Sequence, residues 1–216
     1  LVLENPLSLN GATLKTNGTT FTTNANALTL SGGILEVSGT QNLGGVVPDN
    51  STTLRLAANS TISDNASLSV GTLDLANFAL TLDNAMAGLS IAQPVTLDAA
   101  GEKLVTGAAD LSLNGGISVT AGTLSSTGGT LGLPIGGTFA SGSSFSTSNT
   151  TLNLGGSLAV ADTWTITSTS ISLTTDNASL SSTAPLSLAS LQTNGYDFEL
   201  ASVTSDLTIE NAFALS

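Results

Sequence analysis

Residues 73–82 of this 216-residue chain read LDLANFALTL, and residues 111–119 read LSLNGGISV. In both stretches apolar residues alternate with polar or small ones, which is the period of a β-strand with one buried face. The second stretch is interrupted by Asn114-Gly115, a pair that tolerates the positive φ of a tight corner. The pattern predicts short strands joined at sharp corners.

The alternating pairs recur along the whole chain in three interleaved ladders. Successive members lie about 16 to 25 residues apart, and such a fixed period is typical of a solenoid. The ladders follow one another at intervals of about seven residues, so each turn should hold three strands and three corners. The first ladder runs Leu7, Leu28, Val46, Leu68, Leu89, Leu111, Leu131, Leu152, Ile171, Leu191; the second runs Leu14, Leu35, Leu54, Leu73, Val95, Ile117, Phe139, Leu158, Leu180, Phe198; the third runs Phe21, Leu43, Ile62, Leu80, Leu104, Leu124, Phe145, Trp164, Leu186, Leu207.

We therefore expect an all-β fold, a right-handed parallel β-helix. It should be a three-sided β-solenoid of about ten turns of about 20 residues, continuous over residues 1–216. The right hand dominates crossover connections, and stacked strands about 4.8 Å apart would give a rod about 48 Å long. Leu80, Leu111, Leu152 and Phe198 should be almost fully buried. An antiparallel β-sandwich, with turns about every 8 to 12 residues, is the competing fold.

Composition also indicates an all-β protein with a polar, uncharged surface. Hydrophobic residues make up 40% of the chain, enough for a core, whereas charged residues make up only 8%, against a typical value of about 25%. Ser, Thr and Asn fill the polar positions. These residues are poor in helix interiors because their side chains compete for backbone hydrogen bonds.

The net charge of −12 excludes two classes of partner. A nucleic-acid binder needs a basic stripe to displace counterions, and only Lys15, Arg55 and Lys103 are basic, so we expect no nucleic-acid partner. Attraction to an anionic membrane surface also requires basic residues, so it is excluded for the same reason. No apolar run approaches the roughly 20 residues that span a bilayer, so we expect no membrane insertion.

Several segments resemble the turns of right-handed β-helix surface proteins. They are residues 73–82, 111–119 and 191–200, with the Gly-Thr-Leu triplets at 71–73, 122–124 and 129–131. The similarity is to the passenger regions of autotransporters and to filamentous-haemagglutinin-like adhesins of bacterial surfaces. It implies a structural protein that is extracellular or attached to the cell surface, and it brings no functional residues to this chain.

The sequence offers little catalytic chemistry. It contains no histidine, the usual general base and commonest metal ligand, and no cysteine for thiolate sites. Glycosidases need two converging carboxylates, but the acids here stand singly, and we expect no acid cluster beside Arg55 or Lys103. We therefore expect no enzyme, no cofactor and no catalytic, cofactor-binding or metal-binding residue. The single acids include Asp49, Asp64, Asp74, Asp83, Asp98, Asp110, Asp162 and Asp176.

The function expected is that of an extracellular structural β-solenoid, a segment of a large surface adhesin or a subunit of an extracellular filament. The chain starts at Leu1 without Met, so we expect a piece of a longer precursor. Leu1-Val2-Leu3 and residues 212–216 are strand-like and apolar. Such edges invite pairing, so we expect head-to-tail self-association or continuation of the same chain at both ends.

Two other functions stay open as alternatives. A carbohydrate-binding or carbohydrate-processing β-helix, such as a phage tailspike, would show clustered acids or exposed aromatics along a groove. An ice-binding solenoid would show regular outward Thr on successive turns. The outward neighbours of the third ladder include Thr20 and Thr22, Thr61 and Ser63, Thr123 and Ser125, Ser144 and Ser146, and Thr163 and Thr165, with Asn42, Lys103 and Pro185 as interruptions.

Overall fold

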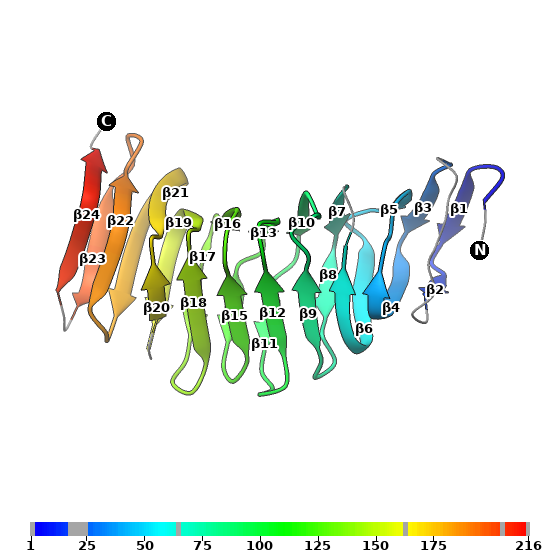
Figure 1. Cartoon of the computed structure of the whole chain (residues 1–216), viewed down its shortest axis with the longest axis horizontal. Coiled ribbons are helices and arrows are strands. Elements are labelled where there is room, and N and C mark those ends of the chain that lie inside the picture. Colours follow the sequence, from blue (N-terminus) through cyan, green and yellow to red (C-terminus); the bar gives the residue numbers. More distant parts are fainter. Residues whose placement is uncertain (1–2, 17–25, 64–65, 162–163, 204–205, 215–216) are drawn as a thin grey trace.

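The chain winds into a parallel β-solenoid of about nine turns, which confirms the predicted all-β fold. This computed structural model describes residues 3–16, 26–63, 66–161, 164–203 and 206–214. Figure 1 shows the coils stacked along one axis, with the two termini at opposite ends. Within the described ranges the chain forms strands, turns and loops, and no helix there could cross a membrane.

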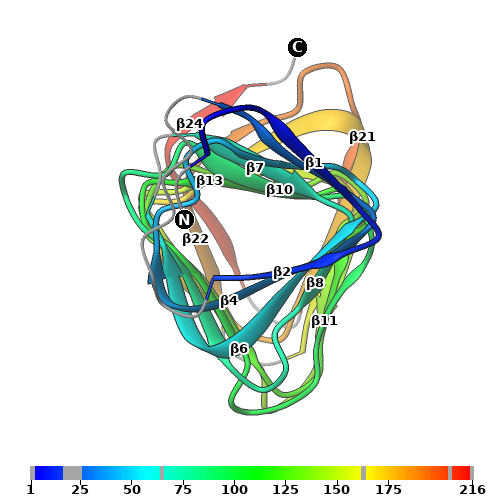
Figure 2. The same ribbon diagram turned by 90° about the vertical axis from the view of Figure 1, so that its right-hand side faces the viewer.

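Seen along its axis, the solenoid is three-sided and right-handed (Figure 2). From the N-terminal end the chain runs clockwise as it recedes, through β1 (Leu7–Asn10) and then β2 (Thr13–Lys15) on the next side. We call the sides, in chain order, the first, second and third face. The length of the coils varies, and Leu80 and its ladder partner Leu104 are 24 residues apart. The turns number about nine rather than the expected ten.

Each face is built from short parallel strands contributed by successive coils, and six longer strands bend around a corner. The first face holds β1, β3 (Leu28–Ser31), β5 (Val46–Pro48), β7 (Ser67–Val70), β10 (Gly88–Ile91), β13 (Asp110–Leu113) and β16 (Thr130–Leu133). The second holds β2, β8 (Thr72–Asp74), β11 (Val95–Leu97), β14 (Ile117–Val119), β17 (Gly136–Phe139) and β23 (Phe198–Val203). The third holds β9 (Ala79–Leu82), β12 (Lys103–Thr106), β15 (Thr123–Ser126), β18 (Ser144–Ser148) and β20 (Trp164–Thr167). The long strands are β4 (Gly33–Gln41), β6 (Thr52–Ile62), β19 (Thr151–Val160), β21 (Ser170–Ser182), β22 (Leu186–Gln192) and β24 (Leu207–Ala214).

The first ladder has the register that the sequence predicts. Leu7, Leu28 and Val46 pair in that order. The rest of the ladder pairs as Leu68, Leu89, Leu111, Leu131, Leu152, Ile171 and Leu191. Equivalent apolar side chains therefore stack directly on one another through the interior.

The second and third ladders were predicted correctly in part, and the predicted register slips at three points. The observed pairs are Ile117 and Leu158 each with Gly137 rather than Phe139, Leu180 with Leu200 rather than Phe198, and Ile62 with Leu82 rather than Leu80. Most strands present two inward residues two positions apart, and alternation alone does not say which of them is in register. Leu43 is buried but lies in a corner outside any strand, and Phe21 lies outside the described residues.

The interior is a continuous apolar core. Leu80, Leu111 and Leu152 are at most 1% exposed, as predicted. The prediction for Phe198 was wrong, because this side chain is only partly buried. Phe198 lies in β23, which among the described strands pairs only with β21, so its other edge is left unpaired by the described part of the chain.

One stretch of the interior combines aromatic rings with buried hydroxyls. The rings of Phe139 and Phe145 stack with centroids 4.2 Å apart, and Phe145 stacks on Trp164 at 4.8 Å. Trp164 Nε1 and Thr169 Oγ1 each donate to the buried Thr147 Oγ1 over 3.0 Å. The polar atoms of the rings and hydroxyls are thus partnered inside the core, as buried polar groups must be.

Ladders are interrupted between described strands at three places, and each interruption lies beside a proline. β5 does not pair with β7 on the first face, β8 does not pair with β11 on the second, and β20 does not pair with β22 on the third. Pro48 ends β5, Pro94 comes directly before β11, and Pro185 comes directly before β22. Proline has no N–H to donate to a neighbouring strand, which accounts for the missing pairs.

Candidate functional surfaces

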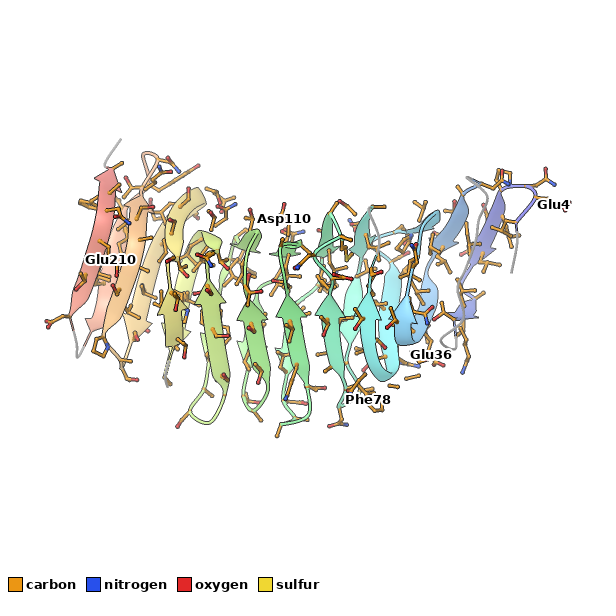
Figure 3. All side chains as sticks on the ribbon, in the orientation of Figure 1. Glu4, Glu36, Phe78, Asp110 and Glu210 are labelled. Carbon is orange, nitrogen blue, oxygen red and sulfur yellow. The ribbon has the colours of Figure 1, made fainter. Side chains whose placement is uncertain are left out.

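Acidic side chains are spread along the rod. Figure 3 shows Glu4, Asp110 and Glu210 at widely separated places. In the part of the chain that the structure describes, no three acidic side chains come close enough to hold a metal ion. Asp64 and Asp162, two of the acids noted in the sequence, lie outside the described residues.

Asp49 is held in a corner by hydroxyl groups from two successive coils. Ser31 Oγ donates to the Asp49 carboxylate over 2.8 Å, and the backbone N–H of Ser51 donates over 2.9 Å. The side-chain hydrogen bond from Ser51, together with that from Ser31, holds the pKa of Asp49 well below its usual range. The carboxylate therefore serves as a structural acceptor that joins two coils.

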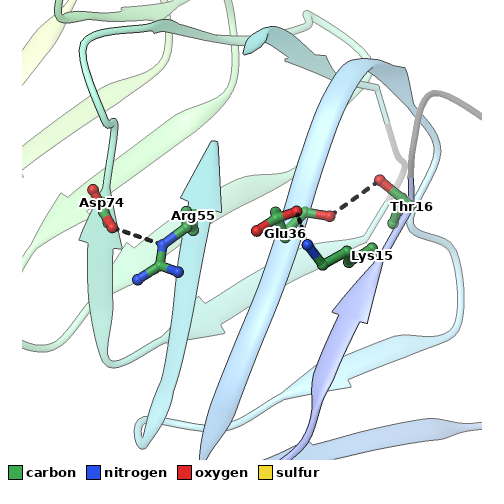
Figure 4. Close-up of polar contacts among 5 residues, drawn as sticks. All are labelled: Lys15, Thr16, Glu36, Arg55 and Asp74. Carbon is green, nitrogen blue, oxygen red and sulfur yellow. Dashed lines mark hydrogen bonds and ion pairs between the residues drawn. The ribbon is translucent and has the colours of Figure 1, made fainter. Parts of the chain in front are cut away.

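Four charged residues form a row of alternating sign on the second face. Lys15, Glu36, Arg55 and Asp74 occupy corresponding positions on β2, β4, β6 and β8. Lys15 Nζ lies 2.9 Å from Glu36 Oε1, and Arg55 Nε lies 2.8 Å from Asp74 Oδ2 (Figure 4). We call these four residues the charge row. Opposite charges on neighbouring strands attract, so the row favours this register over a slipped one.

The charge row was missed by sequence reasoning, which expected no acid cluster beside Arg55 and did not pair it with Glu36 or Asp74. The signal was present, because the four residues are spaced 19 to 21 positions apart, which is the coil period. Both pairs are partly exposed to solvent, and such pairs contribute about 0–1 kcal/mol. Lys103 lies outside this row, between Ala79 and Thr123 of the neighbouring coils.

The third face carries a row of hydroxyl side chains, one per coil, that alternates with the buried ladders. Its members, which we call the hydroxyl row, are Thr40, Thr61, Thr81, Ser125, Ser146 and Thr165, with Val105 in the middle. Ser146 Oγ donates to Ser125 Oγ over 2.8 Å, so neighbouring hydroxyls bond along the stack. The row is uncharged over seven consecutive coils, which is more regular than the sequence suggested.

The other hydroxyl residues noted in the sequence do not extend this row. Thr123 and Ser144 belong to an adjacent row that contains Lys103. Ser63 follows the end of β6. Thr20, Thr22 and Thr163 lie outside the described residues.

A shallow groove of about 300 Å³ crosses β11, β14 and β17 on the second face. Gly137 is among its lining residues, and a Cβ at this position would lie 2.6 Å from Ile117 Cγ2, so the two strands pack closely here. Ile135, which is 60% exposed, stands beside it, and the hydroxyls of Ser118 and Thr138 line it. No charged or aromatic side chain lines this groove, so it lacks the features expected of a tailspike site.

No family model, curated protein or solved structure matches this chain. The structure supports the β-solenoid to which the sequence resemblance points. The functional argument therefore rests on the geometry of the chain itself.

Proposed function

We propose that this protein is an extracellular structural β-solenoid, a length of rod in a large surface adhesin or an extracellular filament, without catalysis. The observation that carries the proposal is the continuous interior ladder from Leu68 to Leu191, in which each coil repeats the contact made by the one before. In such a stack each coil contacts only its neighbours, so length is added without a new kind of interaction. A stalk or fibre requires this way of gaining length by repeating one kind of contact.

The surface supports a passive role outside the cell. The charge row and the Asp49 corner join successive coils, and in the described ranges no three acidic side chains come together. The remaining surface is rich in Ser, Thr and Asn and poor in Lys. Together with the resemblance to β-helix surface proteins, this composition favours an extracellular or cell-surface location.

The two ends of the stack support end-to-end contacts. Leu7 and Leu200 are each 41% exposed and Phe213 is 57% exposed, although all three occupy inward ladder positions. Unpaired strand edges with apolar side chains favour the addition of another coil, from the same polypeptide or from a second copy. Leu7 begins the first ladder, and Phe213 pairs with Leu191 and so extends this ladder by one coil. The two side chains would therefore face each other in a head-to-tail contact. Such a contact does not close and gives an open filament.

Sedimentation of the 216-residue chain tests this assembly. Its average mass should rise with concentration, and Phe213→Asp should abolish the rise because a charge would be buried in the contact. Ile135→Asp is the matched control, since Ile135 is equally exposed but lies on the side of the rod. An average mass that stays at the monomer value at high concentration would contradict end-to-end assembly. So would an equal decrease in average mass for Ile135→Asp and Phe213→Asp.

The absence of catalysis has its own test. The chain should leave a panel of neutral and acidic polysaccharides uncleaved. Cleavage that an Asp→Asn substitution abolishes would overturn this part of the proposal.

Ice binding is a second candidate function, favoured by the hydroxyl row. An uncharged row of hydroxyls on a sheet face, interrupted in this chain at Val105, can order water along one direction. Thermal hysteresis would then be measurable, and Thr81→Lys, which puts a charge into the row, should remove it. An unchanged freezing point for the wild-type chain would reject this candidate.

A further inference from the structure

The coils of the rod are not all joined in the same way. The coil of β10–β12 is joined to the coil of β13–β15 on all three faces, by β10–β13, β11–β14 and β12–β15. The third coil (residues 46–62) is joined to the fourth (residues 67–82) on two faces only, by β6–β8 and β6–β9. On the first face, β5 and β7 lie side by side without ladder pairs.

The orientation of Pro48 explains why this ladder is missing. The N–H of Asp49 donates to Leu30 O of the preceding coil over 3.1 Å. Backbone groups of successive strand residues point alternately to the two sides, so those of Pro48 point to the following coil, where β7 lies. Proline has no N–H to offer there.

The same alternation in the direction of the backbone groups holds at the other two interruptions. Val95 N donates to Gly116 O of the following coil, so Pro94 faces the preceding coil and β8. Leu186 N donates to Asp206 O of the following coil, so Pro185 faces β20. At all three places the absent N–H points toward the strand that is left unpaired, which identifies proline as the cause.

The contact between the third and fourth coils keeps the shortest ladders of the three. Thr53–Arg55 pair with Thr72–Asp74, and Ser60–Ile62 pair with Leu80–Leu82. The next contact along the rod keeps four-residue ladders, β7–β10 and β9–β12. The coil with the third-face interruption keeps the long β19–β21 ladder. One further backbone hydrogen bond extends each of these two ladders, from Gly71 N to Thr52 O and from Asp83 N to Ile62 O. On the surface, the Arg55–Asp74 ion pair and the 2.8 Å bond from Ser69 Oγ to Asn50 Oδ1 also span this place.

We propose that this place is a joint built into the rod, at which the coils up to residue 62 open from the rest as one unit. The first face, which has no ladder there, is the side that opens, and the β6–β8 and β6–β9 ladders act as the hinge. Local opening in proteins follows such boundaries between cooperative units. In a fibre under load, the joint would yield before the coils that are joined on three faces.

Hydrogen exchange measured by mass spectrometry tests the joint. Amides of residues 28–62 should exchange together and faster than those of residues 110–148. The exchange rate should change abruptly between residues 62 and 67. Pro48→Val restores an N–H and keeps an apolar side chain at a buried position. It should slow exchange of residues 28–62 by roughly fivefold, the effect of about one added hydrogen bond.

Pro134→Val is the matched control, because it removes a proline from coils that are joined on all three faces. Pro134→Val makes the unfolded chain more flexible to the same extent as Pro48→Val does. It should nevertheless not slow the exchange of residues 28–62. Fraying from the N-terminal end would instead give a gradual change along the coils that Pro48→Val leaves unaltered. That result, or equal exchange on the two sides of the joint, would overturn the proposal.

Discussion

Thr147 accepts two buried hydrogen bonds at the point where the aromatic stack meets the third face. Trp164 Nε1 and Thr169 Oγ1 both donate to its hydroxyl oxygen, and Thr147 is 1% exposed. Neither donor has access to water if that oxygen is removed. The hydroxyl of Thr147 therefore holds both the indole ring of Trp164 and the corner that contains Thr169 in place.

Thr147→Val removes the hydroxyl and keeps the shape of the side chain. We expect the free energy of unfolding to fall by about 1–3 kcal/mol, because the N–H of Trp164 would be buried without an acceptor. Urea denaturation followed by the fluorescence of Trp164, the single tryptophan, measures the change. Thr165→Val, the same substitution on the exposed side of the adjacent strand, should change it by less than about 0.5 kcal/mol. Equal losses for the two variants would contradict this account of the interior.

Asp49 makes the stability of its corner depend on pH. Hydrogen bonds from Ser51 and Ser31 lower the pKa of Asp49 in the folded protein. Its contribution to stability is therefore complete above the unfolded carboxyl pKa of about 4, and it is lost as the pH falls through the lower folded pKa. The melting temperature of the wild type should drop below about pH 4 more steeply than that of Asp49→Asn. Asp98→Asn, which removes an exposed acid, should keep the wild-type slope; parallel curves for all three proteins would refute the role of Asp49.

At the scale of the strand, alternation of apolar residues was enough to predict the architecture but not every register. A strand such as β17 offers Gly137 and Phe139 as inward positions, and the sequence favoured the larger residue. The structure pairs Gly137 with Ile117, so side-chain size does not set the register there. The charge row and the ladder interruptions had sequence signals, in the spacing of the charges and in the positions of the prolines. The partial exposure of Phe198 depends instead on which strands cover β23.

Each strand is held by the coils on both sides, so one buried charge should disturb several strands. Leu111→Asp places a carboxylate between Leu89 and Leu131, where no partner is available. We expect a loss of more than about 4 kcal/mol in the free energy of unfolding, or failure to fold. Ser112→Asp, on the outward side of the same strand, should cost about 1 kcal/mol or less. Chemical denaturation followed by circular dichroism compares the two, and similar losses would show that the strand does not face the interior as described.

At the scale of the whole molecule, the rod differs from a compact domain in how its stability is distributed. Coils contact only their neighbours, so the exposed ends, the joint at Pro48 and the three-face coils should each have their own stability. The hydroxyl row and the charge row run along the stack and repeat with it. The function that we propose at this scale is mechanical and depends on the length of the rod and on its polar surface.

Electron microscopy of the purified chain over a range of concentrations tests the central claim most directly. A stacking rod predicts particles of constant width whose length increases in steps of one chain as the concentration rises, and single rods for Phe213→Asp. Round particles, or assemblies that grow in width rather than in length, would contradict the account.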